Sequence, residues 1–363
     1  EVNHKLGFIC LRTNRYTEAL RYFSKVRYTN NKKIIDLMLN KSEAFDKLNE
    51  PDSAALYLLN ARSENLKWNG RRKTISHGII LRQEAESLQR KKEFLSALSL
   101  YQQSVIQFSN TFNDTAIAAN PETFSGVFAY IDLFNVLSAK AEVCTELYRQ
   151  ANDTRHLEAS FRAWQSAFRL ADYVERTYNS DESRLFLGKI KHTVHSKPID
   201  ICLQLYELTR KNSYLEEAYL FDQRNKATVL SLSVQENEWK NQSGAVNDLV
   251  SEESRLKSSI TRLSLKAAPM TDTVQQNELY NRIRDMEIAL AGLQEKIAEK
   301  LGWQNSSTGH IPPVNELQKK LDPGTALLSY HLAPGELLVL MISANSFDYV
   351  KLPVKTDFFS DIE

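Results

Sequence analysis

Cysteine, glycine and surplus charge are all scarce in this sequence. Only 3 cysteines and 11 glycines occur among 363 residues, and 46 lysines and arginines nearly match 45 aspartates and glutamates, for a net charge of +1. Cys10, Cys144 and Cys202 lie too far apart for a metal-ligand spacing, so we expect reduced thiols packed on helix faces. A nearly neutral chain has no general attraction for nucleic-acid phosphates or anionic membranes. No apolar run reaches the roughly 18 residues of a membrane span. We therefore expect neither nucleic acid nor membrane as a partner.

The motifs of common catalytic and cofactor sites are missing too. The sequence contains no GxGxxG or GxxxxGK phosphate loop, no GxSxG turn and no HExxH metal frame. His192 and His195 are three residues apart, but the nearest downstream acid, Asp200, follows a helix-disfavouring proline, Pro198. We interpret the two histidines as a solvated pair. The sequence thus assigns no catalytic, cofactor-binding or metal-binding residue.

What the sequence does contain is a recurring pattern of small and aromatic residues. Ala19 follows the aromatic Tyr16 by three positions and precedes Phe23 by four, and Ala97 and Tyr101 repeat that order. In a helical hairpin, a small residue lets two helices cross closely, and an aromatic four residues on fills the groove beside it. The remaining positions that we assign to this pattern are Gly7, Ala54, Leu58, Ala61, Ser160, Trp164, Ala167 and Ala218.

The spacing of the pattern resembles that of the tetratricopeptide (TPR) repeat family. Ala19 and Ala54 are 35 residues apart, close to the roughly 34 of that repeat. The resemblance covers residues 1–235 and implies about five stacked helical hairpins, made irregular by insertions at Asn69–Lys73 and Asn110–Gly126. The alternative is an ordinary helical bundle in which the alanines recur by chance.

The resemblance also implies a binding surface. In TPR hairpins the first helix of each pair lines the concave face. Aligned on the repeat alanines, that face carries Glu43 and Asp46 in the second copy, and Arg82, Glu86 and Gln89 in the third. Such side chains can hold a protein or peptide segment through charge-assisted hydrogen bonds. The alternative is that they are merely solvated.

After residue 235 the pattern changes to heptads. Apolar residues spaced by four and three predict an antiparallel coiled helical hairpin over residues 236–304, broken at Ala267–Thr273 around a proline. We expect it to pack within the chain, with self-association as the alternative. The heptad positions are Leu249, Leu256, Ile260 and Leu263, then Leu279, Ile283, Met286, Leu290, Leu293 and Ile297.

Residues 305–363 predict a linker, a short helix and a β-meander. The helix spans Val314–Leu321, and the strands span Thr325–Leu332, Leu337–Ser343 and Phe347–Leu352. So apolar a sheet of three strands needs a cover. We expect the coiled hairpin to cover it through residues such as Leu290 and Ile297. The alternative is pairing of an exposed sheet edge with a second copy of the chain.

The start of this C-terminal segment resembles the entry into a CHAT domain, the caspase-like domain found behind TPR arrays. The resemblance rests on Leu317–Leu321, Thr325–Tyr330 and the apolar strand after them, and on a helix over Leu215–Leu230 that is similar to the last repeat of that family. Active members use a His–Cys pair that lies well after these strands. The resemblance therefore carries no catalytic residue onto this sequence. His331, with no cysteine after it, is expected to be a packing or edge residue.

Together these features predict a mainly α protein. A TPR-like solenoid (1–235) precedes a coiled hairpin (236–304), then a linker and the first strands of a truncated CHAT-like domain (305–363). The predicted function is a protein-interaction scaffold, the regulatory or substrate-recruiting arm of a TPR–CHAT protein, without cofactor. The alternatives are the non-catalytic half of a caspase-like cysteine protease, and a structural scaffold with a degenerate CHAT domain. The first and last residues suggest a piece of a longer protein, which leaves localisation open, cytoplasmic by default.

Overall fold

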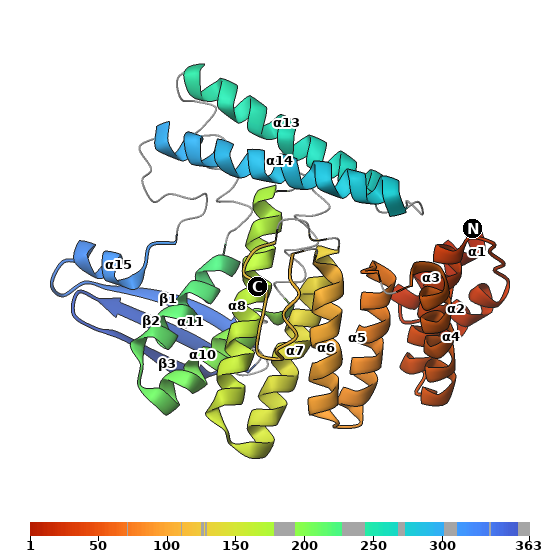
Figure 1. The fold of residues 1–363 in the computed structure, drawn as a ribbon. Coiled ribbons are helices and arrows are strands. Elements are labelled where there is room, and N and C mark those ends of the chain that lie inside the picture. Colours follow the sequence, from red (N-terminus) through yellow and green to blue (C-terminus); the bar gives the residue numbers. More distant parts are fainter. Residues whose placement is uncertain are drawn as a thin grey trace. The chain divides into compact units, whose positions relative to one another are not determined.

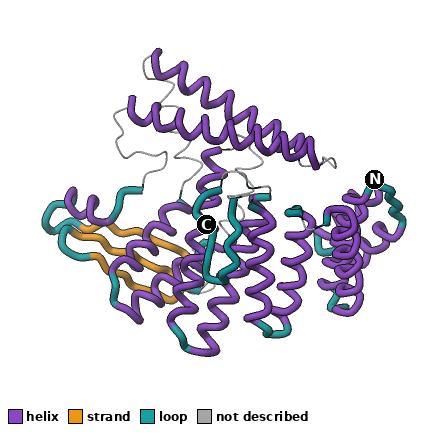
Figure 2. The backbone as a smooth tube through the Cα atoms, in the orientation of Figure 1, coloured by secondary structure: helices purple, strands orange, loops and turns teal. Residues whose placement is uncertain are grey.

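The chain is mainly helical, with one small antiparallel sheet, as its sequence predicts. Thirteen helices and three strands occur among the described residues of the computed structural model (Figures 1 and 2). None of these helices is long and apolar enough to cross a membrane. The chain forms two compact units, residues 1–174 with 260–288, and residues 175–259 with 289–363. The described residues are 1–70, 72–109, 111–124, 127, 129–177, 193–226, 244–267, 273–300, 311–333 and 335–354.

The first unit contains four successive helical hairpins. Each pairs one helix with the next along the chain, and the hairpins follow one another from red to yellow-green in Figure 1. Neighbouring hairpins pack through α2 and α3, α4 and α5, and α6 and α7. The helices are α1 (Val2–Arg12), α2 (Tyr16–Ser24), α3 (Asn31–Lys47), α4 (Pro51–Asn69), α5 (Ile75–Arg90), α6 (Phe94–Phe108), α7 (Tyr130–Ala151) and α8 (Thr154–Thr177).

Every one of these hairpins turns through a single left-handed residue. Its φ lies between 51° and 63°, a conformation that asparagine tolerates better than most residues. In the first hairpin the Arg15 N–H then donates to the Cys10 carbonyl at 2.8 Å, which closes a Schellman motif, and the second and third hairpins repeat this bond at 2.9 Å. The left-handed residues are Asn14, Asn49, Lys92 and Asn152.

The shared turn fixes the repeat register and corrects part of the sequence alignment. Five residues after the left-handed position come the alanines of the first three hairpins, all buried. In the fourth hairpin that place belongs to Leu157, so the copy aligned on Ser160, Trp164 and Ala167 is three residues out of register. Those three side chains are buried nonetheless, because residues three positions apart lie on the same face of a helix.

Close helix crossings explain why small residues recur in the hairpins. A Cβ atom added at Gly7 would lie 2.5 Å from a ring carbon of the fully buried Phe23, and 3.2 Å from the Ala19 carbonyl oxygen. Gly78 meets the ring of Phe108 in the same way, also at 2.5 Å. The glycines therefore let an aromatic ring from the second helix lie directly against the backbone of the first.

A buried lysine pins the insertion between α6 and α7. Lys140 is 1% exposed, and its Nζ donates to Gln102 Oε1 at 2.6 Å, to the Ala119 carbonyl at 2.7 Å and to Asn120 Oδ1 at 2.9 Å. Desolvation lowers the pKa of Lys140 to about 8. Three acceptors are what an ammonium group needs when it is removed from water.

The second unit contains a fifth hairpin of the same design, followed by the sheet. Helices α10 (Ser196–Thr209) and α11 (Asn212–Asn225) join through Arg210, whose φ is 56°. The strands are β1 (Ala326–Ala333), β2 (Glu336–Ser343) and β3 (Phe347–Pro353), in the order β1-β2-β3, with both pairs antiparallel. Helix α15 (Val314–Lys320) packs on β2. The predicted helix and strands agree with these bounds to within a residue.

The cover of the sheet differs from the one expected. The hydrogen bonds, ion pair and ring contact described for its covered side join it to α10, α11 and α15, rather than to the Leu290 and Ile297 that the sequence predicted. Tyr349 of β3 donates to a carboxylate of α10, Lys351 Nζ lies 3.3 Å from another, and Phe347 packs edge-on against a tyrosine of α11. The sequence pattern missed this because the α10–α11 face that receives the sheet is partly polar. On the covered face, Leu338, Leu340 and Ile342 are buried.

One buried carboxylate joins α11 to β1. Asp222 is 1% exposed and accepts hydrogen bonds from Lys226 Nζ at 2.5 Å, from Ser329 Oγ and Gln223 Nε2 at 3.0 Å each, and from His331 Nδ1 at 3.2 Å. The other ring nitrogen of His331 lies 3.0 Å from Ser196 Oγ at the start of α10. His331 is thus a packing residue, as predicted, although it belongs to an edge strand.

The coiled hairpin follows the predicted heptads in part. Helices α13 (Gly244–Ala267) and α14 (Thr273–Lys300) stop and start at the two ends of the predicted break. A buried glutamate interrupts the apolar seam, since Glu253 of α13 accepts a hydrogen bond from Gln294 of α14 at 2.9 Å. The buried heptad residues are Ile260, Leu279, Ile283, Leu290 and Ile297, whereas Leu249, Leu256, Leu263, Met286 and Leu293 are half-buried.

The crossing at Gly7 yields a matched test. Gly7→Val in α1 and Gly292→Val in α14 make the same change inside a helix, but nothing lies within 4 Å of a Cβ at Gly292. We expect Gly7→Val to lose about 1–3 kcal/mol of stability through overpacking, and Gly292→Val to change it little. Thermal unfolding followed by circular dichroism measures both, and equal effects would contradict the close crossing.

The burial and pairing of Asp222 lead us to expect that the stability of the fold around the sheet falls at acid pH. Burial alone raises the pKa of this carboxyl, but the hydrogen bonds from His331, Lys226 and Ser329, with the charge of Lys226, outweigh burial and hold the pKa below its ordinary value. The ionised carboxylate therefore stabilises the fold above the unfolded-state pKa, and this stability is lost as pH falls through the folded-state pKa.

We therefore expect Asp222→Asn to cost roughly 3 kcal/mol at neutral pH, the scale for breaking a buried ion pair. The difference from wild type should shrink below about pH 4, where the wild-type carboxyl is protonated. Urea unfolding between pH 3 and pH 7 gives the comparison, with the exposed Asp348→Asn as the control. A difference that stayed constant over this range would show that the carboxylate charge is unimportant.

Candidate functional site

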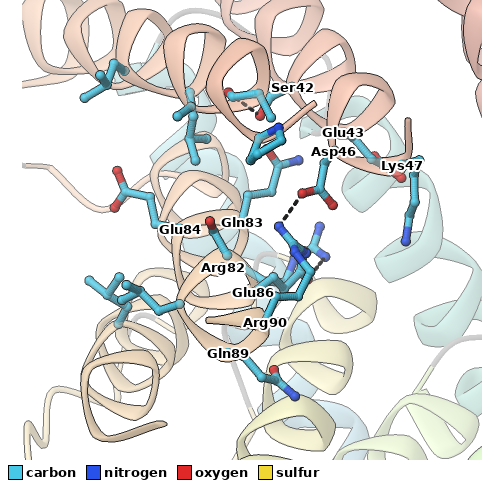
Figure 3. A pocket seen from close by; sticks show the side chains of 18 of the residues that line it. Ser42, Glu43, Asp46, Lys47, Arg82, Gln83, Glu84, Glu86, Gln89 and Arg90 are labelled. Atoms are coloured by element: carbon cyan, nitrogen blue, oxygen red, sulfur yellow. Dashed lines mark hydrogen bonds and ion pairs between the residues drawn. The ribbon is translucent and has the colours of Figure 1, made fainter. Parts of the chain in front are cut away.

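A pocket of ≈ 930 Å³ lies between the α3–α4 and α5–α6 hairpins of the first unit (Figure 3). Its wall takes side chains from all four helices and from Glu146 of α7. All five side chains that the sequence predicted for the concave face line it: Glu43 and Asp46 of α3, and Arg82, Glu86 and Gln89 of α5. We call this pocket the α3–α6 groove.

Helix caps and helical spacing bring these side chains together. The Asn30 side chain caps α3 by accepting from the Lys33 N–H, and the Thr74 hydroxyl caps α5 by accepting from the His77 N–H, both at 3.1 Å. Polar residues three or four apart then share one face of each helix. The two faces meet across the groove, since α3 and α5 are in contact.

Arginines at the groove rim pair with carboxylates set deeper in the wall. Arg62 of α4 donates twice to Glu84, at 3.0 and 3.1 Å. Arg90 of α5 pairs with Asp46 across the two hairpins, one of the contacts that Figure 3 marks with a dashed line. On the same helix face, Glu43 receives two hydrogen bonds from Arg12 of α1, at 2.9 and 3.3 Å.

One arginine lies inside the groove rather than at its rim. Arg82 donates to Glu86 at 2.7 Å and lies 3.9 Å from Asp132 of α7. Its Nε atom and the neighbouring Gln83 Oε1 are buried and have no hydrogen-bond partner within the described part of the chain. Buried polar atoms normally find a partner, so the groove retains hydrogen-bonding capacity.

A buried tyrosine of the repeat core supports the groove residue Gln89. Tyr101 is fully buried and donates its hydroxyl proton to Gln89 Oε1 at 2.7 Å. Burial, followed by the charge of Glu86, raises the pKa of this phenol. Tyr101 therefore stays neutral and fixes the Gln89 amide, so that its NH₂ group is the part left to face a ligand.

The remaining wall of the groove is apolar and comes mainly from the second helices of the two hairpins. Ala54 and Leu58 are buried in it, and Leu59 is 61% exposed. Phe94 and Leu100 of α6 complete this side. A charged wall faces an apolar one, an arrangement that suits an extended segment carrying both kinds of side chain.

Nothing described in the chain has the geometry of a metal or thiol-dependent catalytic site. No group of three or more potential metal ligands occurs among the described residues. His192 falls outside them, and the His195 ring packs 4.7 Å from that of His331. All three cysteines are buried, and desolvation raises the pKa of Cys144 to about 11 and that of Cys202 well above its ordinary value.

Sequence reasoning found one wall of the groove and missed the other. It considered only the first helix of each pair, so the α4 contribution of Leu58, Leu59 and Arg62 went unnoticed. Arg90 was within reach, because it follows Glu86 by four residues and shares its face. Ion pairs between hairpins, such as Arg90 with Asp46, depend on how the hairpins stack, and the spacing of residues in the sequence does not predict that stacking.

No family model, curated protein or solved structure matches this chain.

Proposed function

We propose that this chain is a protein-interaction scaffold that holds an extended segment of a partner protein in the α3–α6 groove. The observation that carries the proposal is the convergence of the five predicted polar side chains in one pocket, opposite an apolar wall. Polar groups that fix orientation beside an apolar surface are typical of binding sites for peptide segments.

The hairpin design supports assignment to the TPR type. Five hairpins share one left-handed turn, and small residues occupy the crossing five residues later in three of them. We further propose that the helix–strand order after the hairpins is the entry into a CHAT-like domain. The chain would then be the regulatory or substrate-recruiting arm of a TPR–CHAT protein. Self-association through the edge strands β1 and β3 stays a prediction.

A role in binding rather than catalysis also agrees with the state of the thiols. A cysteine nucleophile needs a thiolate and access to solvent, whereas these three side chains are buried. In the native chain we expect Cys10, Cys144 and Cys202 to react with a disulfide reagent far more slowly than in urea, and alkylation to abolish no binding. A cysteine that reacted rapidly in the native chain, and whose alkylation abolished a measured activity, would contradict this.

The groove is tested by filling it. Ala55 lines the groove with an exposed side chain, so Ala55→Trp should block it and leave the fold intact. Peptides selected from a random phage-displayed library on wild type should bind this variant at least tenfold more weakly. Leu95→Trp is the control, because Leu95 is 64% exposed on α6 outside the groove. Peptides that bound both variants like wild type would place binding elsewhere.

A further inference from the structure

The charges of the α3–α6 groove are layered by depth. The side chains of Glu84, Asp46 and Glu43 are 16%, 21% and 23% exposed, whereas their arginine partners at the rim are 52–54% exposed. Among the other lining residues, Glu86 and Glu146 are half-buried, and Lys47 and Lys92 are exposed. The carboxylates thus form the wall, and every lining cation except Arg82 stands outside it.

We propose that the partner segment of the α3–α6 groove is basic, with lysine or arginine side chains that replace the rim arginines as counterions of the wall carboxylates. This inference rests on the proposed function and adds the chemistry of the partner. An exposed ion pair contributes little, because solvent screens it and its long side chain is mobile. Arg62 and Arg90 can therefore swing into solvent when a partner cation enters.

Around Arg82, the one cation inside the groove, carboxylates outnumber the cation that neutralises them. Arg82 has two carboxylate neighbours, Glu86 and Asp132. Desolvation raises the pKa of Asp132, the charges of Arg82 and Arg12 lower it only in part, and the charges of Glu43 and Glu86 raise it further. A second cation in the groove would relieve this crowding of carboxylates.

An acidic segment meets the opposite situation. It would bring carboxylates against Glu43, Asp46 and Glu84, while Arg82, the cation inside the groove, already donates to Glu86 at 2.7 Å. Like charges set side by side at an interface are unfavourable and exclude wrong partners. The layering therefore selects the sign of the partner, while the apolar wall with Leu59 accommodates an aliphatic side chain between the basic ones.

The test compares three synthetic peptides of about nine residues, each with a central leucine and four identical residues on either side of it. These residues are arginine in the basic peptide, glutamine in the neutral one and glutamate in the acidic one. Fluorescence anisotropy with purified full chain should rank them basic, neutral, acidic in falling affinity. Binding of the basic peptide should weaken with added salt. Asp46→Asn and Glu84→Gln should each weaken it about fivefold, the factor expected of a half-exposed ion pair.

Removal of a rim arginine should strengthen binding of the basic peptide, whereas removal of a wall carboxylate weakens it. A merely structural role of the arginine would not produce stronger binding. Arg90→Ala and Arg62→Ala should strengthen binding of the basic peptide several-fold, because each removes an internal competitor. Arg155→Ala is the matched control, since Arg155 pairs with Asp153 at a turn away from the groove. Preference for the acidic peptide, or weaker binding of the basic peptide to Arg90→Ala, would overturn the inference and leave the scaffold proposal standing.

The inference also fails if none of the three peptides binds wild type, or if Ala55→Trp binds the basic peptide as wild type does. The phage selection then decides the scaffold proposal separately.

Discussion

The close packing of two helices within a hairpin is the constraint on which this structure depends. A left-handed residue reverses the chain within two or three residues, and in three of the hairpins a buried alanine follows it by five positions. At Gly7 and Gly78 an aromatic ring of the second helix lies against the backbone of the first. Residues at those positions are buried in the packing of the hairpin and cannot contact a partner. The face of each first helix that points away from the crossing is left for other use, and in α3 and α5 it carries the polar wall of the α3–α6 groove. The same geometry therefore fixes the core and frees the surface that can bind.

The fifth hairpin shows how one substitution changes what a repeat packs against. Twelve residues after the left-handed turn, the other hairpins place an apolar or small residue, whereas this one places Asp222. A carboxylate cannot be buried there unless donors arrive with it. Ser329 and His331 of β1 supply two of these donors, and Gln223 and Lys226 supply the other two. The sheet is thus matched to this hairpin by hydrogen bonds that a further helical repeat would need to reproduce. The corresponding residues are Val26, Ala61, Ser104 and Trp164.

Sequence reasoning succeeded where a local rule decides the structure and failed where tertiary contacts do. The ends of α15 and the three strands followed from turns and alternation, and the wall residues of α3 and α5 from the repeat alanines. The register of the fourth copy failed because Leu157 takes the place of an alanine, so residue size gave the wrong phase. The sheet cover failed because apolar pattern favoured the heptad seam, while polar partners such as Asp222 hold β1. A buried charge pair has no periodicity, so no pattern predicts it.

The carboxylates of the α3–α6 groove and the buried Asp222 can be compared directly. In both, carboxylates lie in positions of reduced solvation, and what differs is the mobility of their partners. Asp222 is held by groups that are themselves fixed by β1 and α11, so its pairing is permanent in the fold. The groove carboxylates are held by arginines on long, half-exposed side chains, which neutralise the empty groove without filling it. Because such counterions are exchanged at little cost, the charge of the groove is available to a partner, and that of the core is not.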